Sequence, residues 1–483
     1  MNPLSMDQPT MGLLRVAMLA FIVMAFSPLP AHPSLLSHAS LTTAEEEDLG
    51  EEFMRHLKTR CTLIKDPSIV DYVNKIGQEI VRQHPSPPFL FRFYIVHEDV
   101  YNAFASPAGH VFIYSGLLAA METEEELAGI LAHEVAHVFC RHISERIEQS
   151  KKIGLMTLAG ILAGAFAGGS PEVAGAITSS SIAAGQALSL KYSREDEREA
   201  DQVGLKYLTK AEYSGEGLLS MLQKIRAKHW FGSDQIPSYV TTHPAIEERI
   251  AYLDTWMQTH PEWKGHERPK DQRAFRKVQT RLVALYTDAA AARRTFSAQL
   301  GKDSEDALGH YGMGLVYGRE GERKKAVENL KQALQVRPLD GDILRDLGKI
   351  YFQMGDYDNA VKALLGVLAS NASDREARFF LGRSQIESGD LDSALETFND
   401  MAGNNADDFP VDYYLGETYG KMGNEAEAHF RLGLHYKKKE DFKNAVFHLR
   451  RALTLSAKDP ARQKVIKEVL KGLRELSVQR QSD

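Results

Sequence analysis

The chain has 483 residues, of which 43% are hydrophobic and 25% are charged, and its formal net charge is −7. This length and composition allow roughly two or three globular domains with sizeable hydrophobic cores. The acidic balance leaves no basic surface for a polyanion, so we expect no nucleic acid as a partner. Two cysteines, Cys61 and Cys140, are too few for a disulfide framework, although they could pair with each other.

The N-terminal 31 residues look like an export signal. Arg15 precedes the apolar run 16–26, and the segment 27–31 then supplies two prolines and a small residue before a cut after Ala31. A run of eleven residues is too short to cross a bilayer, although an uncleaved membrane anchor remains the alternative. We therefore expect a periplasmic or secreted protein without residues 1–31.

Two helices and two strands are predicted next. Start signals favour helices at 43–60 and 67–83, and aromatic and β-branched residues favour strands at 89–96 and at Gly109–Tyr114. A strand just before a metal-binding helix often forms the edge on which a protease holds an extended peptide by strand addition. An ordinary core hairpin explains the second strand equally well, so both interpretations stay open.

The segment Glu124–Arg146 is predicted to form one helix. Thr123 and Glu126 have the spacing of a capping box, and acidic residues fill the first turn, where the helix dipole favours them. Apolar residues at helical spacing supply a buried stripe: Leu127, Ile130, Leu131, Val135 and Val138.

This helix contains the pattern HExxH, formed by His133, Glu134 and His137. Residues four apart on a helix lie about 40° apart on one face, so both imidazoles can reach one Zn²⁺ ion. Glu134 would then lie beside the open position of the metal and take a proton from water there. The alternative is a surface helix with two incidental histidines.

Between residues 151 and 190 the composition shifts to alanine, glycine, serine and leucine. Small residues that alternate with larger ones favour a flexible helical hairpin near the site, either a lid or an element that contacts a membrane. A true membrane span is the alternative, because seventeen consecutive mostly apolar residues are close to the lower limit for one.

A catalytic zinc site with two histidines needs a third protein ligand and an open fourth position. The acidic segment 193–201 offers Glu197 and Asp201, which are four apart and therefore on one helix face. One carboxylate can bind the metal while the other accepts a hydrogen bond from a ligand histidine. A solvated charged helix is the usual alternative for such a run.

His142 is the rival third ligand. It follows His133 by nine residues, which places it on the opposite face of a continuous helix. The glycine and the spacing of a metzincin motif are also absent, so we expect that His142 does not bind the metal.

These motifs resemble those of the gluzincin peptidases, the family that includes the prenyl-protein CAAX endopeptidases and the HtpX-type membrane peptidases. HEVAH at 133–137 is followed by SREDEREAD at 193–201, and the segments NAFA at 102–105, GHVFIYSGLL at 109–118 and THP at 242–244 also fit. The resemblance covers roughly residues 42–255.

The resemblance implies a role for each site residue. Glu197 would be the third zinc ligand and Asp201 the partner of a ligand histidine. His243 and Arg249 would line the cleft, where either could steady an oxyanion, and His243 could occupy the open metal position in closed forms.

The C-terminal half contains a repeat of 34 residues, marked by Gly314, Gly348, Gly382 and Gly416. An alanine follows each glycine after twelve residues, which is the spacing of tetratricopeptide repeats. A further set that begins at Gly433 is shifted by only 17 residues, so one helix would serve two overlapping repeats. Thr280, Ala292 and Phe296 indicate a degenerate leading repeat.

We therefore predict an α+β protein that is mainly α-helical. Its segments would be a signal peptide at 1–31, a zincin-like metallopeptidase domain with a small sheet at 42–260, a linker at 261–271 and an all-α solenoid of tetratricopeptide repeats at 272–475. Solenoids of this kind offer a concave surface to extended peptides or partner proteins.

This domain combination resembles the BepA-type periplasmic peptidases. It implies a zinc-dependent endopeptidase, with one Zn²⁺ per chain, that acts on misfolded or stalled proteins during assembly of outer-membrane β-barrel proteins. The repeats would contact the assembly machinery, and the protein could touch the membrane peripherally. The alternative is a chaperone or scaffold with a latent zinc site, but the intact Glu134 favours an enzyme, because a structural site needs no general base.

Overall fold

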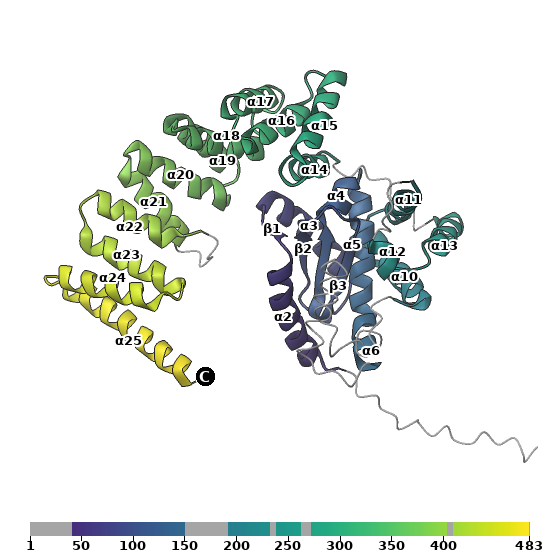
Figure 1. Cartoon of the computed structure of the whole chain (residues 1–483), viewed down its shortest axis with the longest axis horizontal. Coiled ribbons are helices and arrows are strands. Elements are labelled where there is room, and N and C mark those ends of the chain that lie inside the picture. The colour runs from purple at the N-terminus through teal and green to yellow at the C-terminus, as the bar shows by residue number, and fades with distance from the viewer. Residues whose placement is uncertain (1–40, 150–191, 232–237, 262–271, 403–408, 483) are drawn as a thin grey trace, which may run out of the picture.

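The computed structural model describes residues 41–149, 192–231, 238–261, 272–402 and 409–482 (Figure 1). A domain with a small sheet is followed by a curved array of helix pairs, which confirms the predicted mainly helical α+β fold. No helix in the described ranges has both the length and the apolar character of a membrane span. The predicted signal peptide and the predicted hairpin at 151–190 lie outside the described residues.

Four strands form one mixed sheet in the order β1-β2-β4-β3. The strands β2 and β4 are parallel, and the other two pairs are antiparallel. Their bounds are β1 Leu63–Ile64, β2 Arg92–Val96, β3 Ala103–Ser106 and β4 His110–Tyr114.

The predicted strand at Gly109–Tyr114 exists, but it is not an edge strand. β4 pairs with β2 on one side and with β3 on the other, and all five of its residues are buried. The short turn Pro107–Gly109 causes this, since it returns the chain directly from β3 onto β4. Within the described residues, β3 instead pairs on one side only and forms the sheet edge.

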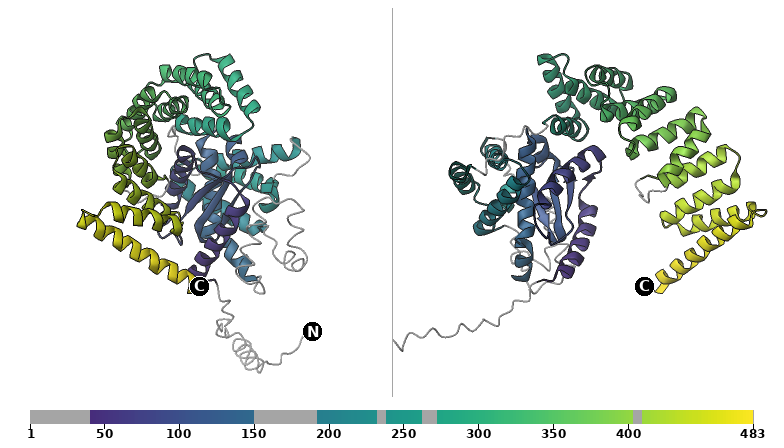
Figure 2. Two further views of the ribbon diagram at one scale, coloured as in Figure 1. Left: turned by 60° about the vertical axis from the view of Figure 1, so that its left-hand side comes forward. Right: turned by 180° about the vertical axis from the view of Figure 1, so that it is seen from behind.

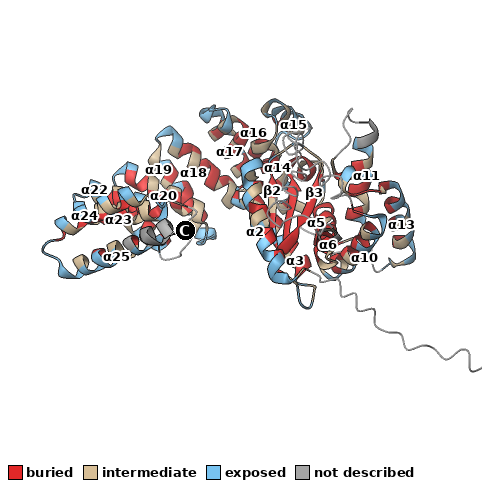
Figure 3. Cartoon of the chain, turned by 60° about the horizontal axis from the view of Figure 1, so that its bottom comes forward, coloured by how far each residue is buried: buried red, intermediate tan, exposed pale blue. Residues whose placement is uncertain are grey.

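Nine helices are described in this domain, and one of them, α5, is buried on nearly every side (Figure 3). Backbones of neighbouring helices approach α5 closely: a Cβ added at Gly129 would lie 2.6 Å from the Leu218 nitrogen, and one at Gly204 3.1 Å from the Ala132 oxygen. The helices are α2 Thr43–Arg60, α3 Pro67–Val81, α4 Ser115–Ala120, α5 Glu124–Phe139, α6 His142–Gln149, α10 Arg194–Lys210, α11 Glu216–Phe231, α12 Ser238–Thr242 and α13 Ile246–Thr259.

The prediction of one helix from Glu124 to Arg146 is wrong. α5 ends at Phe139, and Arg141 adopts a left-handed conformation with φ of 58° before α6 begins. The Arg141 guanidinium donates to the carbonyl of Leu41, at 2.6 Å, and pairs with the buried carboxylate of Glu46 in α2. A buried carboxylate needs a cationic partner, so this tertiary contact favours the turn over a continued helix.

The repeat array follows the predicted period of 34 residues. Each marker glycine of an outer helix faces the residue sixteen positions later in the next helix: a Cβ would lie 2.8 Å from Leu330 at Gly314, 2.7 Å from Leu364 at Gly348 and 2.7 Å from Phe398 at Gly382. Any side chain at these positions would collide with its partner helix. The period therefore records the close approach of paired helices.

The shifted repeat is also confirmed. Gly416 of α22 faces Leu432 of α23, while Gly433 of α23 faces Leu449 of α24, so α23 serves two overlapping pairs. The array consists of α14 Gln272–Tyr286, α15 Ala289–Lys302, α16 Ala307–Arg319, α17 Arg323–Val336, α18 Gly341–Met354, α19 Tyr357–Ser370, α20 Arg375–Ser388, α21 Leu391–Ala402, α22 Val411–Lys421, α23 Glu425–Lys438, α24 Phe442–Leu455 and α25 Pro460–Ser482.

The first helix of the array, α14, is also part of the N-terminal domain. Phe275, Val278 and Leu282 belong to the hydrophobic core of that domain. From α14 the array curves away so that its concave side faces the domain (Figure 1, Figure 2).

A buried charge cluster fixes this junction. Arg281 of α14 pairs with Asp66, which caps α3, at 2.8 Å, and with Asp346 of α18. Tyr311 accepts a hydrogen bond from Arg281 and donates one to Asp346, both at 2.8 Å. Next to this cluster, Arg345 donates to the Ser68 hydroxyl at 2.6 Å. Two elements of the array and one of the domain therefore share the Arg281 guanidinium.

Arg281→Met should lower the free energy of unfolding by about 3–5 kcal/mol, because it leaves the buried carboxylates of Asp66 and Asp346 without their cation. Arg293→Met is the matched control: Arg293 pairs with Glu320, but its side chain is 46% exposed, and the loss should stay below about 1 kcal/mol. Urea denaturation measures both. Equal losses would show that the Arg281 cluster does not stabilise the junction.

Candidate metal centre

The two histidines of the HExxH pattern lie one turn apart on α5, as their spacing predicts. Their Nε2 atoms are 3.0 Å apart, and both side chains are completely buried. Two nitrogens that bind one tetrahedral zinc ion, each at about 2.0 Å, are separated by about 3.3 Å. The imidazoles of His133 and His137 therefore converge at a distance that suits a shared metal ion.

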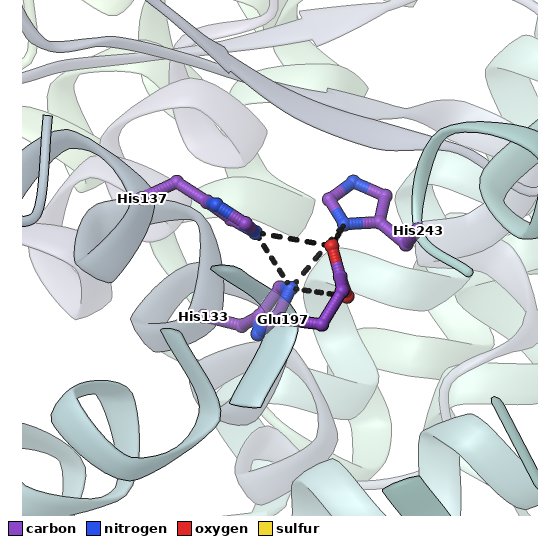
Figure 4. Close-up of side chains that lie close together, drawn as sticks. All are labelled: His133, His137, Glu197 and His243. Carbon is purple, nitrogen blue, oxygen red and sulfur yellow. Dashed lines mark hydrogen bonds and ion pairs between the residues drawn. The ribbon is translucent and has the colours of Figure 1, made fainter. Parts of the chain in front are cut away.

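Glu197 reaches the same point from α10 (Figure 4). Its two carboxylate oxygens lie 3.5 Å from the Nε2 atoms of His133 and His137. A capping box of Ser193 and Asp196 starts α10 and thereby fixes the turn that carries Glu197. The structure thus brings together the three residues that were predicted as zinc ligands.

Asp201 lies one turn further along α10 and contacts the far side of His133. Its Oδ1 is 2.9 Å from the His133 Nδ1, so the carboxylate can fix the ring with Nε2 directed at the metal position. Tyr252 donates a hydrogen bond to the same carboxylate. This is the position that the family resemblance implied.

Arg249 of α13 lies behind the ligands and is 1% exposed. It donates to Asp201 through Nε, at 2.8 Å, and through one terminal nitrogen, at 2.7 Å, and its other terminal nitrogen donates to Glu197. These contacts favour a role in anchoring the two carboxylates over the predicted contact with an oxyanion.

His243 follows α12 and closes the fourth side of the cluster. Its Nδ1 is 3.0 Å from Glu197 Oε1 and 3.3 Å from His133 Nε2, and the ring stacks on Tyr239 at 4.3 Å. His243 is completely buried. The four side chains of His133, His137, Glu197 and His243 could together hold a metal ion.

Glu134 is the buried group that has no partner. Neither of its carboxylate oxygens has a hydrogen bond among the described residues, and Oε1 lies 3.6 Å from the His243 Nε2. Burial raises the pKa of Glu134. An orphaned carboxylate beside converging imidazoles fits a centre that would hold zinc and a reacting water, so the donor set suits the metal that the family resemblance implies.

Electrostatics prepare His137 and Glu197 for binding a cation. Burial, and next the neighbouring His133, lower the pKa of His137, which keeps its Nε2 lone pair free. Burial alone would raise the pKa of Glu197, but His243 and Arg249 outweigh it and lower the pKa, so the carboxylate stays ionised. A neutral imidazole and a charged carboxylate are the forms that bind zinc.

Tyr192 is a site residue that the sequence did not reveal. Its ring stacks on His137 with the centroids 3.7 Å apart, and its backbone nitrogen donates to the Thr242 carbonyl at 3.1 Å. It thereby joins the start of α10 to the segment of His243. A tyrosine before a helix usually belongs to the core, so only its place next to the acidic motif marked it.

Family comparisons agree with this geometry. Residues 67–257 match the family model of peptidase family M48. Residues 311–365, 345–409 and 426–459 match models of the tetratricopeptide repeat. The chain contains an M48 peptidase domain followed by tetratricopeptide repeats.

Several curated proteins are similar to this chain. The beta-barrel assembly-enhancing protease of Yersinia pestis is 30% identical over 214 residues, which cover 44% of each chain. The putative beta-barrel assembly-enhancing protease of Vibrio cholerae is 29% identical over 307 residues, or 62% of each chain. The mitochondrial metalloendopeptidase OMA1 of Schizosaccharomyces pombe is 25% identical and covers 44% of this chain and 59% of its own. The chain thus spans about half the length of the curated relatives it matches.

Among solved structures, that of the MamA protein covers 32% of this chain and 94% of its own at 22% identity, with a TM-score of 0.26, too low to support a conclusion.

Asp201→Asn should weaken zinc binding by roughly ten- to a hundredfold, because the amide removes the negative charge that orients His133. Titration against a zinc-binding chelator measures the affinity. Glu195→Gln is the matched control, since Glu195 lies on the same helix but is exposed, and it should leave the affinity unchanged. Equal affinity in wild type and Asp201→Asn would contradict the role of Asp201.

Proposed function

We propose that this protein is a zinc metalloendopeptidase. The observation that carries the proposal is the orphaned, buried Glu134 beside the converging atoms of His133, His137 and Glu197. A zinc ion held by these three ligands would polarise a water molecule and a peptide carbonyl.

Glu134 would perform the proton transfers. Its carboxylate accepts the proton of the attacking water and later gives it to the leaving amine. Burial raises the pKa of Glu134, which brings the acid closer to the neutral range in which a general base and acid work efficiently. His243, whose Nε2 has no hydrogen bond among the described residues, could donate to the oxyanion once a substrate is bound.

The substrate backbone would bind along β3. This strand is the sheet edge next to α5 among the described residues, whereas β4 is paired on both sides. An extended peptide that adds to Ala103–Ser106 by main-chain hydrogen bonds would pass beside the HExxH helix. Proteins that are unfolded or misassembled expose such extended segments, so we expect them as substrates.

We further propose that the site is closed at rest. His243 lies against two of the zinc ligands and against Glu134, where water and substrate must react. Access then requires that the segment of α12 and His243 moves away. This arrangement also gives weight to the second candidate function, a chaperone or scaffold that acts through its repeats while its zinc site is latent.

The biological role follows from the relatives. Two of them are named for the assembly of β-barrels, so we propose quality control during assembly of outer-membrane β-barrel proteins in the periplasm. The concave face of the repeat array would contact the assembly machinery. A peripheral contact with the membrane would complete this arrangement.

Glu134→Gln should reduce cleavage of an unfolded protein such as casein by at least about a hundredfold, because the amide cannot accept the proton. Zinc content should stay at about one per chain. Glu145→Gln, an exposed change just beyond α5, is the control and should cleave like wild type. Full activity of Glu134→Gln would contradict the proposed general base. Assistance with barrel assembly that survives in this variant would belong to the scaffold function.

His243→Ala should raise cleavage by roughly tenfold, because hydrogen bonds of a charged partner stabilise the closed state by about 1.5–3 kcal/mol. Initial rates on casein at saturating zinc measure this effect. His56→Ala replaces a histidine on α2, away from the site, and should not change the rate. Slower cleavage by His243→Ala would show instead that this side chain assists the reaction and does not block it.

A further inference from the structure

The turn after α5 brings a second set of metal-binding side chains together beside the catalytic cluster. A continuous helix would place His142 on the opposite face from His133, and that expectation is wrong. Because Arg141 is left-handed, the chain reverses, and His142 Nδ1 lies 2.9 Å from His137 Nδ1. The other ring nitrogen of His142 then points away from the catalytic cluster, toward α10.

Three different donors meet at this nitrogen. The Cys140 thiol, the His142 Nε2 and the Glu199 carboxylate each offer one atom, and these atoms all lie within 4.8 Å of one another. His142 Nε2 is 3.3 Å from the Glu199 Oε2. His142 is 2% exposed and Glu199 is 61% exposed, so the cluster has a buried base and an opening to solvent.

We propose that Cys140, His142 and Glu199 bind a second divalent metal ion of the zinc class. Zinc–ligand bonds of about 2.0–2.3 Å separate tetrahedral ligands by about 3.3–3.8 Å, so the present distances need to close by only about 1 Å. A thiolate and an imidazole select zinc and similar ions over calcium or magnesium, which prefer oxygen ligands. Water from the open side would complete four ligands.

The cysteine is available for this role. Cys61 and Cys140 are both free thiols, so the disulfide that the sequence allowed is absent from the structure. Cys61 follows the end of α2, whereas Glu46 near the start of α2 pairs with Arg141. At 1.5 Å per residue these two ends of α2 are about 22 Å apart, too far for Cys61 to reach Cys140.

The surroundings of the thiol favour a cation. Burial, and next the carboxylates of Glu199 and Glu145, raise the pKa of Cys140 to about 12. A bound metal ion would counter the same negative field. The second site shares no ligand with the first, since His133, His137 and Glu197 all face the other side of the His137 ring. A single imidazole contact nevertheless links the two sites.

Cobalt(II) tests this proposal, because a cobalt–thiolate bond absorbs in the near ultraviolet and the three catalytic ligands contain no sulfur. Reduced, full-length protein is first given one equivalent of zinc and is then titrated with cobalt(II). We expect a thiolate–cobalt band that saturates at one cobalt per chain. The chain has only two cysteines, so Cys61→Ala is the matched control and should keep the band, whereas Cys140→Ala should lose it.

Glu199→Gln provides the second variant. Its side chain is exposed and outside the catalytic cluster, so it should fold and should keep about one zinc per chain. It should bind cobalt at the second site at least about tenfold more weakly. Absence of the band in wild type, a band that survives Cys140→Ala, or equal cobalt affinity in Glu199→Gln would each overturn the proposal. If Cys140→Ala fails to fold, the affinity of Glu199→Gln decides.

Discussion

The site depends on how two buried carboxylates are neutralised. Glu197 and Asp201 lie on one face of α10 with no exposed surface, and isolated charges of this kind would be too costly to bury. Arg249 compensates for both through three donors, and His133 contacts both as well. Because Arg249 comes from α13, the packing of that helix against α10 is part of the site itself. This constraint keeps the carboxylates in place before any metal binds.

The same principle joins the two halves of the molecule. Arg281 lies between Asp66 of the peptidase domain and Asp346 of the repeats, so the array cannot detach without exposing or stranding buried charge. Apolar residues of α14 complete the junction within the domain core. The repeats are therefore anchored to α3, and α3 packs in turn on the HExxH helix. A partner bound to the concave face of the array would be held at a defined position relative to the catalytic cluster.

Two histidines outside the HExxH pattern surround its second histidine. His243 approaches on the side of the reacting atoms, and His142 approaches on the other side of the ring. Tyr192 stacks on the face of His137 between them. A ligand enclosed in this way has little freedom to reorient, and changes in either neighbouring histidine act directly on the metal centre.

The sequence alone determined the features that follow from regular local geometry. Residues four apart on a helix share a face, which placed His133 with His137, and the period of 34 recorded how closely paired helices pack at glycines such as Gly348. The tertiary structure decided the rest, because it depends on contacts between distant segments. Arg141 ends α5 by pairing with Glu46, 95 residues earlier, and so moves His142 beside His137. The pairing of β3 likewise encloses β4, which no local pattern specifies.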